Sequence, residues 1–274
     1  MIIDGKKLSE ELLIELKEER ASLGKLSLGL IGVGNLEDKL GFIKAKAAAS
    51  KKLDINFRLY ELPENLSREK LRQRISQIVR AKTVNGVIIQ LPLPARFKPQ
   101  YFLNAVRPIK DVDCLASVSL GKFYTDAPSV RPPAVEVIDF LKTKFQLEFA
   151  GKIVAVVGYG GLIGKTTTHY FATEKATVII LNSQTPNPDE LLQSADVIVA
   201  GVGQPKMIQI CKPNASLIDF GYGAENGRLY GDLDFDKLKD KANLITPTPG
   251  GTGPILVAMI FKNLLKLAGL QQKQ

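Results

Sequence analysis

A glycine-rich segment in the second half of the chain has the residue types and spacing that hold a diphosphate. The apolar run 152–157 leads directly into GYGGLIG, residues 158–164, and a helical pattern follows. This order of strand, turn and helix presents backbone N–H groups to phosphate. Gly158 permits the tight turn, Gly160 lets a phosphate approach the backbone, and Gly164 lets the helix sit close to its strand. The GxGxxxG spacing is one residue longer than the commonest fingerprint, and it predicts a dinucleotide site, with plain turn glycines as the alternative.

Two features of the same region bear on which nucleotide binds there. Gly164-Lys165-Thr166 resembles the end of a P-loop, but Tyr159 stands where that motif requires glycine, so we expect no ATP hydrolysis at this loop. About 20 residues further on, an acidic residue would bind the ribose of NAD. Asn182 and Ser183 stand there instead. Their side chains favour NADP, whose additional phosphate accepts hydrogen bonds, and NAD remains the alternative cofactor.

The elements that must position such a site alternate along the chain. In the first part, the apolar pattern predicts strands over residues 26–34, 56–62 and 86–90, with helices over 39–53 and 67–81 between them. A first amphipathic stripe precedes them at the N-terminus. The β-α-β-α-β order predicts a parallel sheet with helices on its faces.

A second α/β unit begins near residue 120. Its pattern predicts helices over 134–144 and 253–267, and buried strands over 152–157, 176–181, 197–200 and 216–220. We therefore predict an α/β protein of two lobes, of which the second is a Rossmann-type lobe with a parallel sheet.

Composition excludes several other classes of protein. With two cysteines and one histidine, the chain has neither a disulfide scaffold nor a Cys/His zinc cluster, and no metal is expected. Residues 1–6 lack the pattern of a signal peptide. The uncharged run 242–261 is long enough to span a bilayer, but its prolines and glycines predict a loop followed by a helix. We expect a reducing, cytoplasmic setting and no contact with a membrane.

The net charge of +9 comes from 37 Lys and Arg residues against 28 Asp and Glu residues. Nucleic acid, or a small anionic substrate with its cofactor, would account for such an excess. The basic residues are scattered along amphipathic helices and form no long arm. We therefore expect solvated helix faces and no nucleic-acid partner.

Three further segments place polar or glycine residues where parallel sheets bind ligands. QLPLP, residues 90–94, puts an amide at the end of a buried strand, and KDVD, residues 110–113, brings two carboxylates near the connection between the lobes. PGGTGP, residues 249–254, brings backbone to the start of the last helix. Each segment alone is also compatible with an ordinary turn.

Taken in this order with the glycine loop, these segments resemble the bifunctional methylenetetrahydrofolate dehydrogenase/cyclohydrolase family over essentially the whole chain. The resemblance implies a folate-binding three-layer α/β lobe (residues 1–118, with the helix 253–274 packing back on it) and an NAD(P)-binding lobe (residues 119–252), with a cleft between them. It implies oxidation of methylenetetrahydrofolate by NADP and hydrolysis of the methenyl product to formyltetrahydrofolate. It also implies a homodimer built through the nucleotide-binding lobes.

The resemblance assigns the reacting residues. The family's helical Tyr-x-x-x-Lys motif corresponds to residues 42–46, so Lys46 takes the position of the catalytic lysine and Phe42 replaces the tyrosine. Desolvated by bound folate, Lys46 would have a lowered pKa and act in proton transfer. Gln90 would orient its amine, and Asp113 would accept hydrogen bonds from the pterin ring. An exposed helix lysine, as at the nearby Lys44, is the alternative for this position.

The same resemblance completes the predicted site. Substrate-binding positions are Phe42, Leu91, Pro249, Gly250, Gly251 and Gly253, and cofactor-binding positions are Gly158, Tyr159, Gly160, Gly164, Asn182, Ser183 and Tyr222.

Several positions depart from the family's pattern. The tyrosine of the lysine motif is Phe42, the serine of the glycine loop is Gly160, and the threonine near the start of the last helix is Leu256. Most of these changes remove a polar group near the expected cleft. A paralogue that binds folate or dinucleotide with lost or altered catalysis is therefore the alternative function. An unrelated Rossmann-type dehydrogenase would leave the three first-lobe and last-helix segments unexplained.

Overall fold

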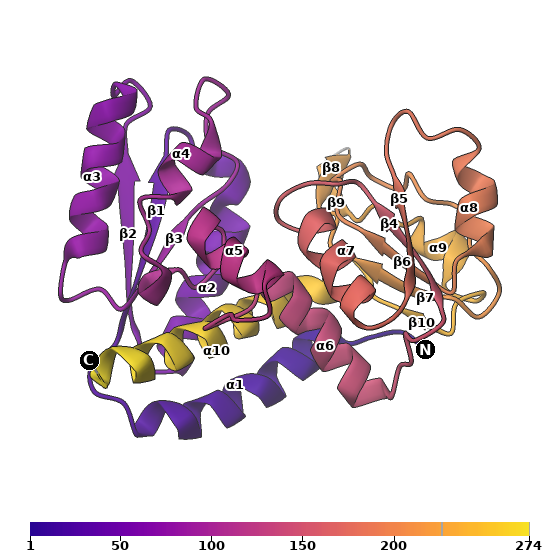
Figure 1. Ribbon diagram of the computed structural model, residues 1–274, viewed down its shortest axis with the longest axis horizontal. Helices are drawn as coiled ribbons and strands as arrows, with labels where there is room; N and C mark the ends of the chain where they lie inside the picture. The colour runs from indigo at the N-terminus through magenta and orange to yellow at the C-terminus, as the bar shows by residue number, and fades with distance from the viewer. Residues whose placement is uncertain (226, 274) are drawn as a thin grey trace. The chain divides into compact units, whose positions relative to one another are not determined.

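The computed structural model describes residues 1–225 and 227–273, and the chain divides into two compact units (Figure 1). The lysine unit, named for Lys46, comprises Glu10–Pro133 and the chain from Val257 onward. The glycine-loop unit comprises Met1–Ser9 and Ala134–Leu256. The boundary expected after residue 118 lies instead after Pro133, because helix α5 (Ser117–Tyr124) follows a turn held by the buried Asp111 of the lysine unit.

The lysine unit is built on a parallel three-stranded sheet with the order β2-β1-β3. Its strands are β1 (Ser27–Val33), β2 (Asn56–Leu62) and β3 (Gly86–Ile89). The chain runs from β1 outward to β2 and then crosses to β3 on the other side of β1. The carboxyl ends of β1 and β3 therefore flank a topological switch point, where open α/β sheets bind ligands.

The predicted helices of this unit are present, and shorter ones join them. They are α2 (Leu40–Lys52), α3 (Arg68–Arg80), α4 (Pro99–Leu103), α5 and the part of α1 (Gly5–Ala21) from Glu10 onward, with 3-10 turns at Glu37–Lys39 and Pro108–Lys110. Ser67 caps α3, the helix expected over 67–81, because its hydroxyl accepts a hydrogen bond from the Lys70 N–H at 3.2 Å. Apolar residues of α3, including Leu71 and Ile75, are buried against Ile31 and Ile89 of the sheet.

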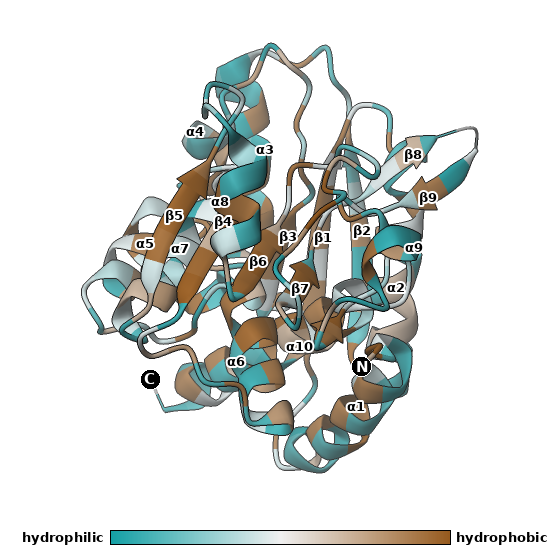
Figure 2. Cartoon of the chain, turned by 90° about the vertical axis from the view of Figure 1, so that its right-hand side faces the viewer, coloured by the Kyte–Doolittle hydropathy of each residue, from teal (hydrophilic) through white to brown (hydrophobic). Residues whose placement is uncertain are grey.

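The glycine-loop unit holds a parallel five-stranded sheet with the order β10-β7-β6-β4-β5. Its strands are β4 (Ile153–Val157), β5 (Thr177–Leu181), β6 (Val197–Ala200), β7 (Ser216–Asp219) and β10 (Leu244–Ile245). Most of these strand residues are apolar (Figure 2) and most are buried, as expected for a parallel sheet covered on both faces. Here the switch point lies between β4 and β6, because the chain leaves β4 for β5 and returns to β6 on the other side.

Helices and a small hairpin complete this unit. The helices are α6 (Pro133–Phe145), α7 (Gly164–Thr173), α8 (Pro188–Ser194) and α9 (Phe235–Leu238), and the hairpin pairs β8 (Gly223–Glu225) with β9 (Arg228–Tyr230). Leu192 of α8 and Leu238 of α9 belong to one buried cluster with strand residues such as Ile198. The N-terminus adds to the sheet, since the Ile3 N–H donates to the Ile245 carbonyl at 3.0 Å.

The last helix, α10 (Thr252–Gln272), extends beyond the residues 253–267 that its apolar pattern predicts. Its length and apolar composition would allow it to cross a bilayer, but 61% of that apolar window is buried within the protein, as in the core helix of a globular domain. In the lysine unit, the Asn263 amide donates to the carbonyls of Val112 and Arg131, both at 2.9 Å. These bonds tie the helix to the KDVD segment.

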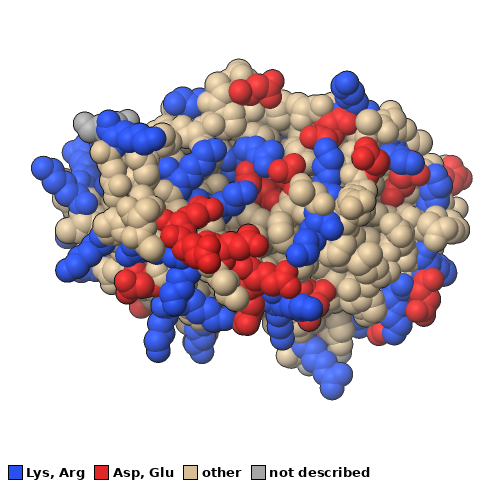
Figure 3. Space-filling view, turned by 90° about the horizontal axis from the view of Figure 1, so that it is seen from below, with Lys and Arg blue, Asp and Glu red and all other residues tan. Residues whose placement is uncertain are grey.

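Charged side chains are spread over the surface. On the face shown in Figure 3, lysine and arginine side chains lie among acidic ones. Ion pairs such as Lys52–Glu10 at 2.8 Å join neighbouring elements. This distribution fits the expectation that the excess charge lies on solvated helix faces.

Candidate functional site

Lys46 lies on the buried face of α2. Ile43, Lys46 and Ser50 share that face at helical spacing, and Lys46 is only 6% exposed, whereas Lys44 is exposed. Burial lowers the pKa of the Lys46 ammonium, and the negative charge of Asp113 partly offsets that shift. The position is therefore not that of an ordinary solvated lysine, and the alternative drawn from the sequence does not apply.

Gln90 holds the lysine at the switch point of the sheet. It follows β3 directly, and its N–H donates to the Ile31 carbonyl of β1 at 2.8 Å. Its side-chain oxygen accepts a hydrogen bond from the Lys46 amine at 3.2 Å, while its amide nitrogen donates to the Leu91 carbonyl at 3.0 Å. Both ends of the amide are thus engaged, and its oxygen is a hydrogen-bond partner of the lysine amine.

Asp113 lies on a turn whose conformation is fixed by hydrogen bonds of the buried Lys110 and Asp111. Lys110 donates to the Val79 and Ala81 carbonyls at the end of α3, at 2.9 and 2.8 Å. Asp111 accepts from the Leu115 and Ala116 N–H groups at 3.2 and 2.8 Å. Lys110 and Asp111 therefore build the turn, and Asp113 is the carboxylate left for chemistry.

The charges of this site are coupled. Desolvation raises the pKa of Asp113 to about 6, the positive charge of Lys46 opposes that rise, and the negative charge of Asp111 adds to it. Burial therefore disfavours the charged form of both groups, lowering the pKa of Lys46 and raising that of Asp113. The Phe42 ring completes the group, with its centroid 5.8 Å from the Lys46 nitrogen. Phe42 stands at the tyrosine position of the Tyr-x-x-x-Lys motif, so the aromatic ring is present without the hydroxyl.

In the glycine-loop unit, the loop between β4 and α7 has the geometry predicted for it. Gly158 has a φ of +86°, and a Cβ on Gly164 would lie 2.1 Å from the Gly158 carbonyl oxygen, so both positions require glycine for the fold itself. A Cβ on Gly160 would meet nothing within 4 Å. Tyr159 and Gly160 are exposed at the N-terminal end of α7. Backbone N–H groups and open space are therefore present where a diphosphate would sit.

The turn after β5 is ordered by its own side chains. The Asn182 side-chain oxygen accepts from the Gln184 N–H, and the Asn182 N–H donates to the Thr185 hydroxyl, both at 2.9 Å. Ser183 is exposed. Tyr222 precedes the β8–β9 hairpin, and its carbonyl lies 3.4 Å from where a Cβ on Gly203 would stand. Asn182 and Ser183 follow β5 at the same edge of the sheet as the glycine loop.

The PGGTGP segment forms a tight turn before α10. Gly250 has a φ of +104°, and Gly251 donates its N–H to the Pro247 carbonyl at 2.7 Å. A Cβ on Gly251 would lie 2.4 Å from that same carbonyl oxygen, so the turn itself requires glycine there. At Gly253 a Cβ would meet nothing within 4 Å. The exposed Pro249 begins the turn, after a cis peptide bond.

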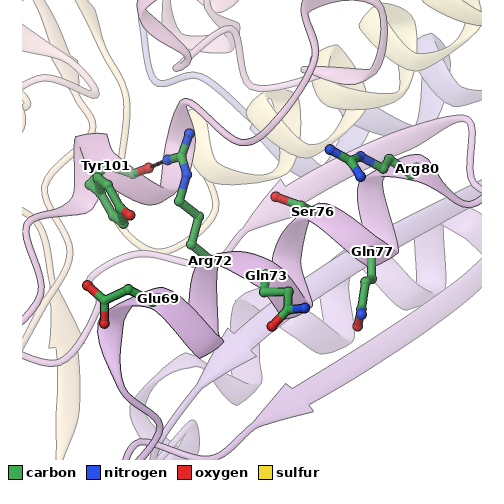
Figure 4. Close-up of a pocket in the computed structure, with 7 residues that line it drawn as sticks. All are labelled: Glu69, Arg72, Gln73, Ser76, Gln77, Arg80 and Tyr101. Atoms are coloured by element: carbon green, nitrogen blue, oxygen red, sulfur yellow. Dashed lines mark hydrogen bonds between the residues drawn. The ribbon is translucent and has the colours of Figure 1, made fainter.

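A hollow of about 370 Å³ on the surface of α3 is separate from these groups (Figure 4). Its lining consists of Glu69, Arg72, Gln73, Ser76, Gln77, Arg80 and Tyr101. Arg72 donates to the Tyr101 carbonyl and lies over the Tyr101 ring, 4.5 Å from its centroid. None of the residues predicted for the site lines this hollow. Over residues 1–225 and 227–273, no group of three or more His, Cys, Asp or Glu residues is arranged to hold a metal ion.

Comparison with known proteins identifies the family. The model of the tetrahydrofolate dehydrogenase/cyclohydrolase catalytic domain matches residues 3–113, and that of the family's NAD(P)-binding domain matches residues 132–272. The chain belongs to the tetrahydrofolate dehydrogenase/cyclohydrolase family. One relative, the bifunctional protein FolD 2 of Desulfitobacterium hafniense, is 34% identical over 100% of this chain and 98% of its own length.

Solved structures of the family have the same fold. The bifunctional FolD enzyme of Campylobacter jejuni superposes with a TM-score of 0.93 at 27% identity, covering 99% of each chain. The FolD enzyme of Trypanosoma brucei, solved in complex with NADP cofactor and an inhibitor, gives a TM-score of 0.93 at 29% identity, covering 100% of this chain and 99% of its own. The predicted two-lobed α/β fold is confirmed, with a catalytic domain and an NAD(P)-binding domain.

Some residues that shape this family member's site were missed by sequence reasoning. In the sequence, Lys110 and Asp111 stand out only as part of a motif, and no motif marks the buried acids Asp219 and Asp232. Each is 9% exposed or less. A signal was present, since charged residues inside apolar runs are rarely buried without partners, but those partners come from distant segments of the chain.

Proposed function

We propose that this chain oxidises methylenetetrahydrofolate with NADP and hydrolyses the methenyl product to formyltetrahydrofolate; its solved relatives carry the name methylenetetrahydrofolate dehydrogenase/cyclohydrolase, and one is solved with NADP. The observation that carries the proposal is the buried Lys46 amine held by the Gln90 side chain at 3.2 Å, at the switch point of the sheet. Burying an amine costs free energy, so an apolar residue would serve the packing of α2 better, and packing alone does not account for Lys46.

The hydrolytic step follows from the state of that amine. Water adds to the methenyl carbon as Lys46, in its neutral form, takes one of the water protons and later releases it to solvent. The second water proton passes to the departing nitrogen as one carbon–nitrogen bond breaks and the C=O of the formyl group forms. The lowered pKa of Lys46 increases the fraction of neutral amine at pH 7. Gln90 fixes the direction of the amine lone pair, and Asp113 anchors the pterin ring through hydrogen bonds to its amino and N–H groups.

The residues of the glycine-loop unit fit a dinucleotide. Gly158 and Gly164 shape the loop, the open space at Gly160 admits a diphosphate, and α7 contributes its N-terminal N–H groups. We expect the exposed Asn182 and Ser183, which follow β5, to bind the additional phosphate of NADP. When bound, NADP accepts the hydride that leaves the methylene carbon. The protein's part in that step is to position the two reactants.

The test is a time course with the purified protein, methylenetetrahydrofolate and either NADP or NAD. Absorbance follows the reduced nicotinamide and the methenyl intermediate together. We expect nicotinamide reduction with no build-up of methenyl, and faster reduction with NADP. Accumulation of the methenyl intermediate would show that the protein has the dehydrogenase activity only. If neither cofactor is reduced, the proposed oxidation is wrong.

Substitution of the lysine tests its role directly. We expect Lys46→Ala to reduce methenyl hydrolysis to the spontaneous rate, a loss of about 10² to 10⁴-fold, because general acid–base catalysis contributes that much. Lys44→Ala, on the exposed face of the same helix, is the matched control and should retain full activity. Hydrolysis by Lys46→Ala above the spontaneous rate would show that this lysine is not the base.

A paralogue that binds without turnover is the second candidate function. The specific observation in its favour is the loss of two hydroxyls, at Phe42 and at Gly160. Binding titrations with folate and NADP, run beside the turnover assay, separate the two candidates. Binding of both ligands without reduction or hydrolysis would establish the second.

We further propose a homodimer built through the glycine-loop units and a cytoplasmic location. In that unit the apolar side chains of Met207 and Leu229 are exposed, at 43% and 38%. Both cysteines are free and buried, which suits a reducing compartment. Size-exclusion chromatography with light scattering would reveal a monomer if the dimer proposal is wrong, and localisation of a tagged chain tests the compartment.

A further inference from the structure

Two buried carboxylates lie at the carboxyl edge of the five-stranded sheet. Asp219 ends β7 and is 1% exposed, and Asp232 follows β9 and is 0% exposed. Within residues 1–225 and 227–273, neither forms a salt bridge, and backbone N–H groups satisfy them instead. Burying two acids side by side is costly, so their retention calls for a reason.

Asp232 binds three successive backbone N–H groups. It accepts from Val202 at 2.6 Å and from Gly203 and Gln204 at 2.8 Å each. These residues follow the carboxyl end of β6. Successive N–H groups of this kind form a concave site for an anion, and here the protein's own carboxylate occupies it. The conformation of the loop 201–204 therefore depends on Asp232.

That loop packs against the glycine loop at two points. A Cβ on Gly158 would lie 2.8 Å from the Val202 side chain, and a Cβ on Gly201 would lie 2.9 Å from the side chain of Ile163. Gly158 begins the glycine loop, and Ile163 directly precedes α7. The two loops flank the switch point between β4 and β6, where a dinucleotide binds in such a sheet.

Asp219 holds Asp232 in place. Its carboxylate accepts from the Gly221 N–H at 2.7 Å and from the Leu233 N–H, next to Asp232, at 3.0 Å. Glycines leave the room for both acids. A Cβ on Gly221 would lie 2.2 Å from Asp232, and a Cβ on Gly231 would lie 2.0 Å from Asp219. The pair is therefore interlocked, and Asp232 is its member that reaches the β6 loop.

We propose that Asp232 is a positioning residue for the dinucleotide, which it serves by fixing the loop 201–204 and, through Val202, the glycine loop that receives the diphosphate. Asp232 does not touch the reacting atoms. This role rests on the proposed use of NADP, and it is confined to the dehydrogenase reaction, because hydrolysis of the methenyl compound consumes no nicotinamide.

The experiment compares Asp232→Asn with the matched control Asp236→Asn, whose side chain is 87% exposed. For Asp232→Asn we expect the Kd and KM for NADP to rise at least about tenfold, since hydrogen bonds to a charged group are lost. We expect a smaller change in kcat and wild-type hydrolysis of methenyltetrahydrofolate in the same sample. Asp236→Asn should leave NADP binding unchanged.

A second variant keeps the test decisive if Asp232→Asn folds poorly. Val202→Ala retains the carboxylate and its three N–H bonds but removes the contact with Gly158, and we expect it to weaken NADP binding. In the double variant, which combines Asp232→Asn with Val202→Ala, NADP binding should weaken by less than the two single losses combined. Unchanged NADP binding in either folded variant overturns the role, as does an equal loss of both activities in Asp232→Asn. A wild-type protein that binds no NADP overturns the proposed function, and this role with it.

Discussion

At Phe42, the chain carries an aromatic ring beside the lysine but no hydroxyl. The ring centroid lies 5.8 Å from the Lys46 nitrogen, close enough for the ring face to attract the ammonium. That attraction favours the charged lysine, whereas the proposed hydrolysis uses the neutral one. A hydroxyl at this position would add a hydrogen-bond partner for the amine or for the attacking water.

Phe42→Tyr should therefore raise kcat/KM for methenyl hydrolysis about fivefold, the effect of one additional hydrogen bond of about 1 kcal/mol. Initial rates with purified variants measure this. Phe42→Leu, which removes the ring without adding a hydroxyl, is the control and should not show the fivefold gain that the hydroxyl gives. A Tyr variant no faster than the wild type would mean that the hydroxyl has no role in this family member.

The pH dependence of folate binding should report the titration of Asp113. Its pKa is raised to about 6, so the carboxylate that binds the pterin is lost as the pH falls through that value, rather than near the ordinary pKa of an aspartate. We expect KM for methylenetetrahydrofolate to rise below about pH 6 in initial-rate measurements from about pH 5 to about pH 8. Asp113→Asn should show a higher KM with no such rise, and a wild-type KM that is flat across this range would contradict the assignment.

Among the elements, the turn between β4 and α7 separates glycines that the fold requires from one that it does not. Gly158 and Gly164 are fixed by a positive φ and by a close backbone contact, whereas Gly160 has open space and an exposed position. Gly160→Ser should therefore fold normally and bind NADP about fivefold more tightly, because its hydroxyl adds a donor to the diphosphate. Calorimetric titration measures the Kd.

Two variants control that experiment. Gly160→Ala adds a side chain without a hydroxyl and should bind NADP no better than the wild type. Gly164→Ser would place its Cβ 2.1 Å from the Gly158 carbonyl oxygen, and should lose NADP binding together with thermal stability. If Gly160→Ala and Gly160→Ser both bound NADP more tightly than the wild type, and to the same degree, the hydroxyl would not be the cause.

Elements with a strong local pattern could be predicted from the sequence, and elements made by distant contacts could not. Strands β1, β3 and β6 are continuous buried runs, and Ser67 is a typical N-cap residue at the start of α3. By contrast, β10 is two residues long and exists through its pairing with β7. The Lys46–Gln90 pair was predicted because a family motif placed both residues. No such motif marks Asp232, and the backbone N–H groups that donate to it lie about 30 residues away in sequence.

For the whole molecule, the two units are not consecutive pieces of chain. The path passes from one to the other after Ser9, after Pro133 and after Leu256. The first residues belong to the glycine-loop sheet, since the Ile245 N–H donates to the Met1 carbonyl at 2.9 Å and Ile3 returns a bond to the Ile245 carbonyl. The domain limits drawn from sequence put these residues in the other lobe, because a three-residue segment has no pattern that reveals its pairing.

Ile3→Ala should therefore destabilise the sheet that carries the glycine loop. The side chain is 1% exposed, and truncating such an isoleucine costs about 2 to 5 kcal/mol of unfolding free energy. Urea denaturation measures this loss. Ile2→Ala is the matched control, because Ile2 also bridges to Ile245 through its backbone but its side chain is 55% exposed, so its stability should change by less than about 0.5 kcal/mol. Equal stability of the two variants would mean that the first residues of the chain contribute only their backbone hydrogen bonds to the sheet.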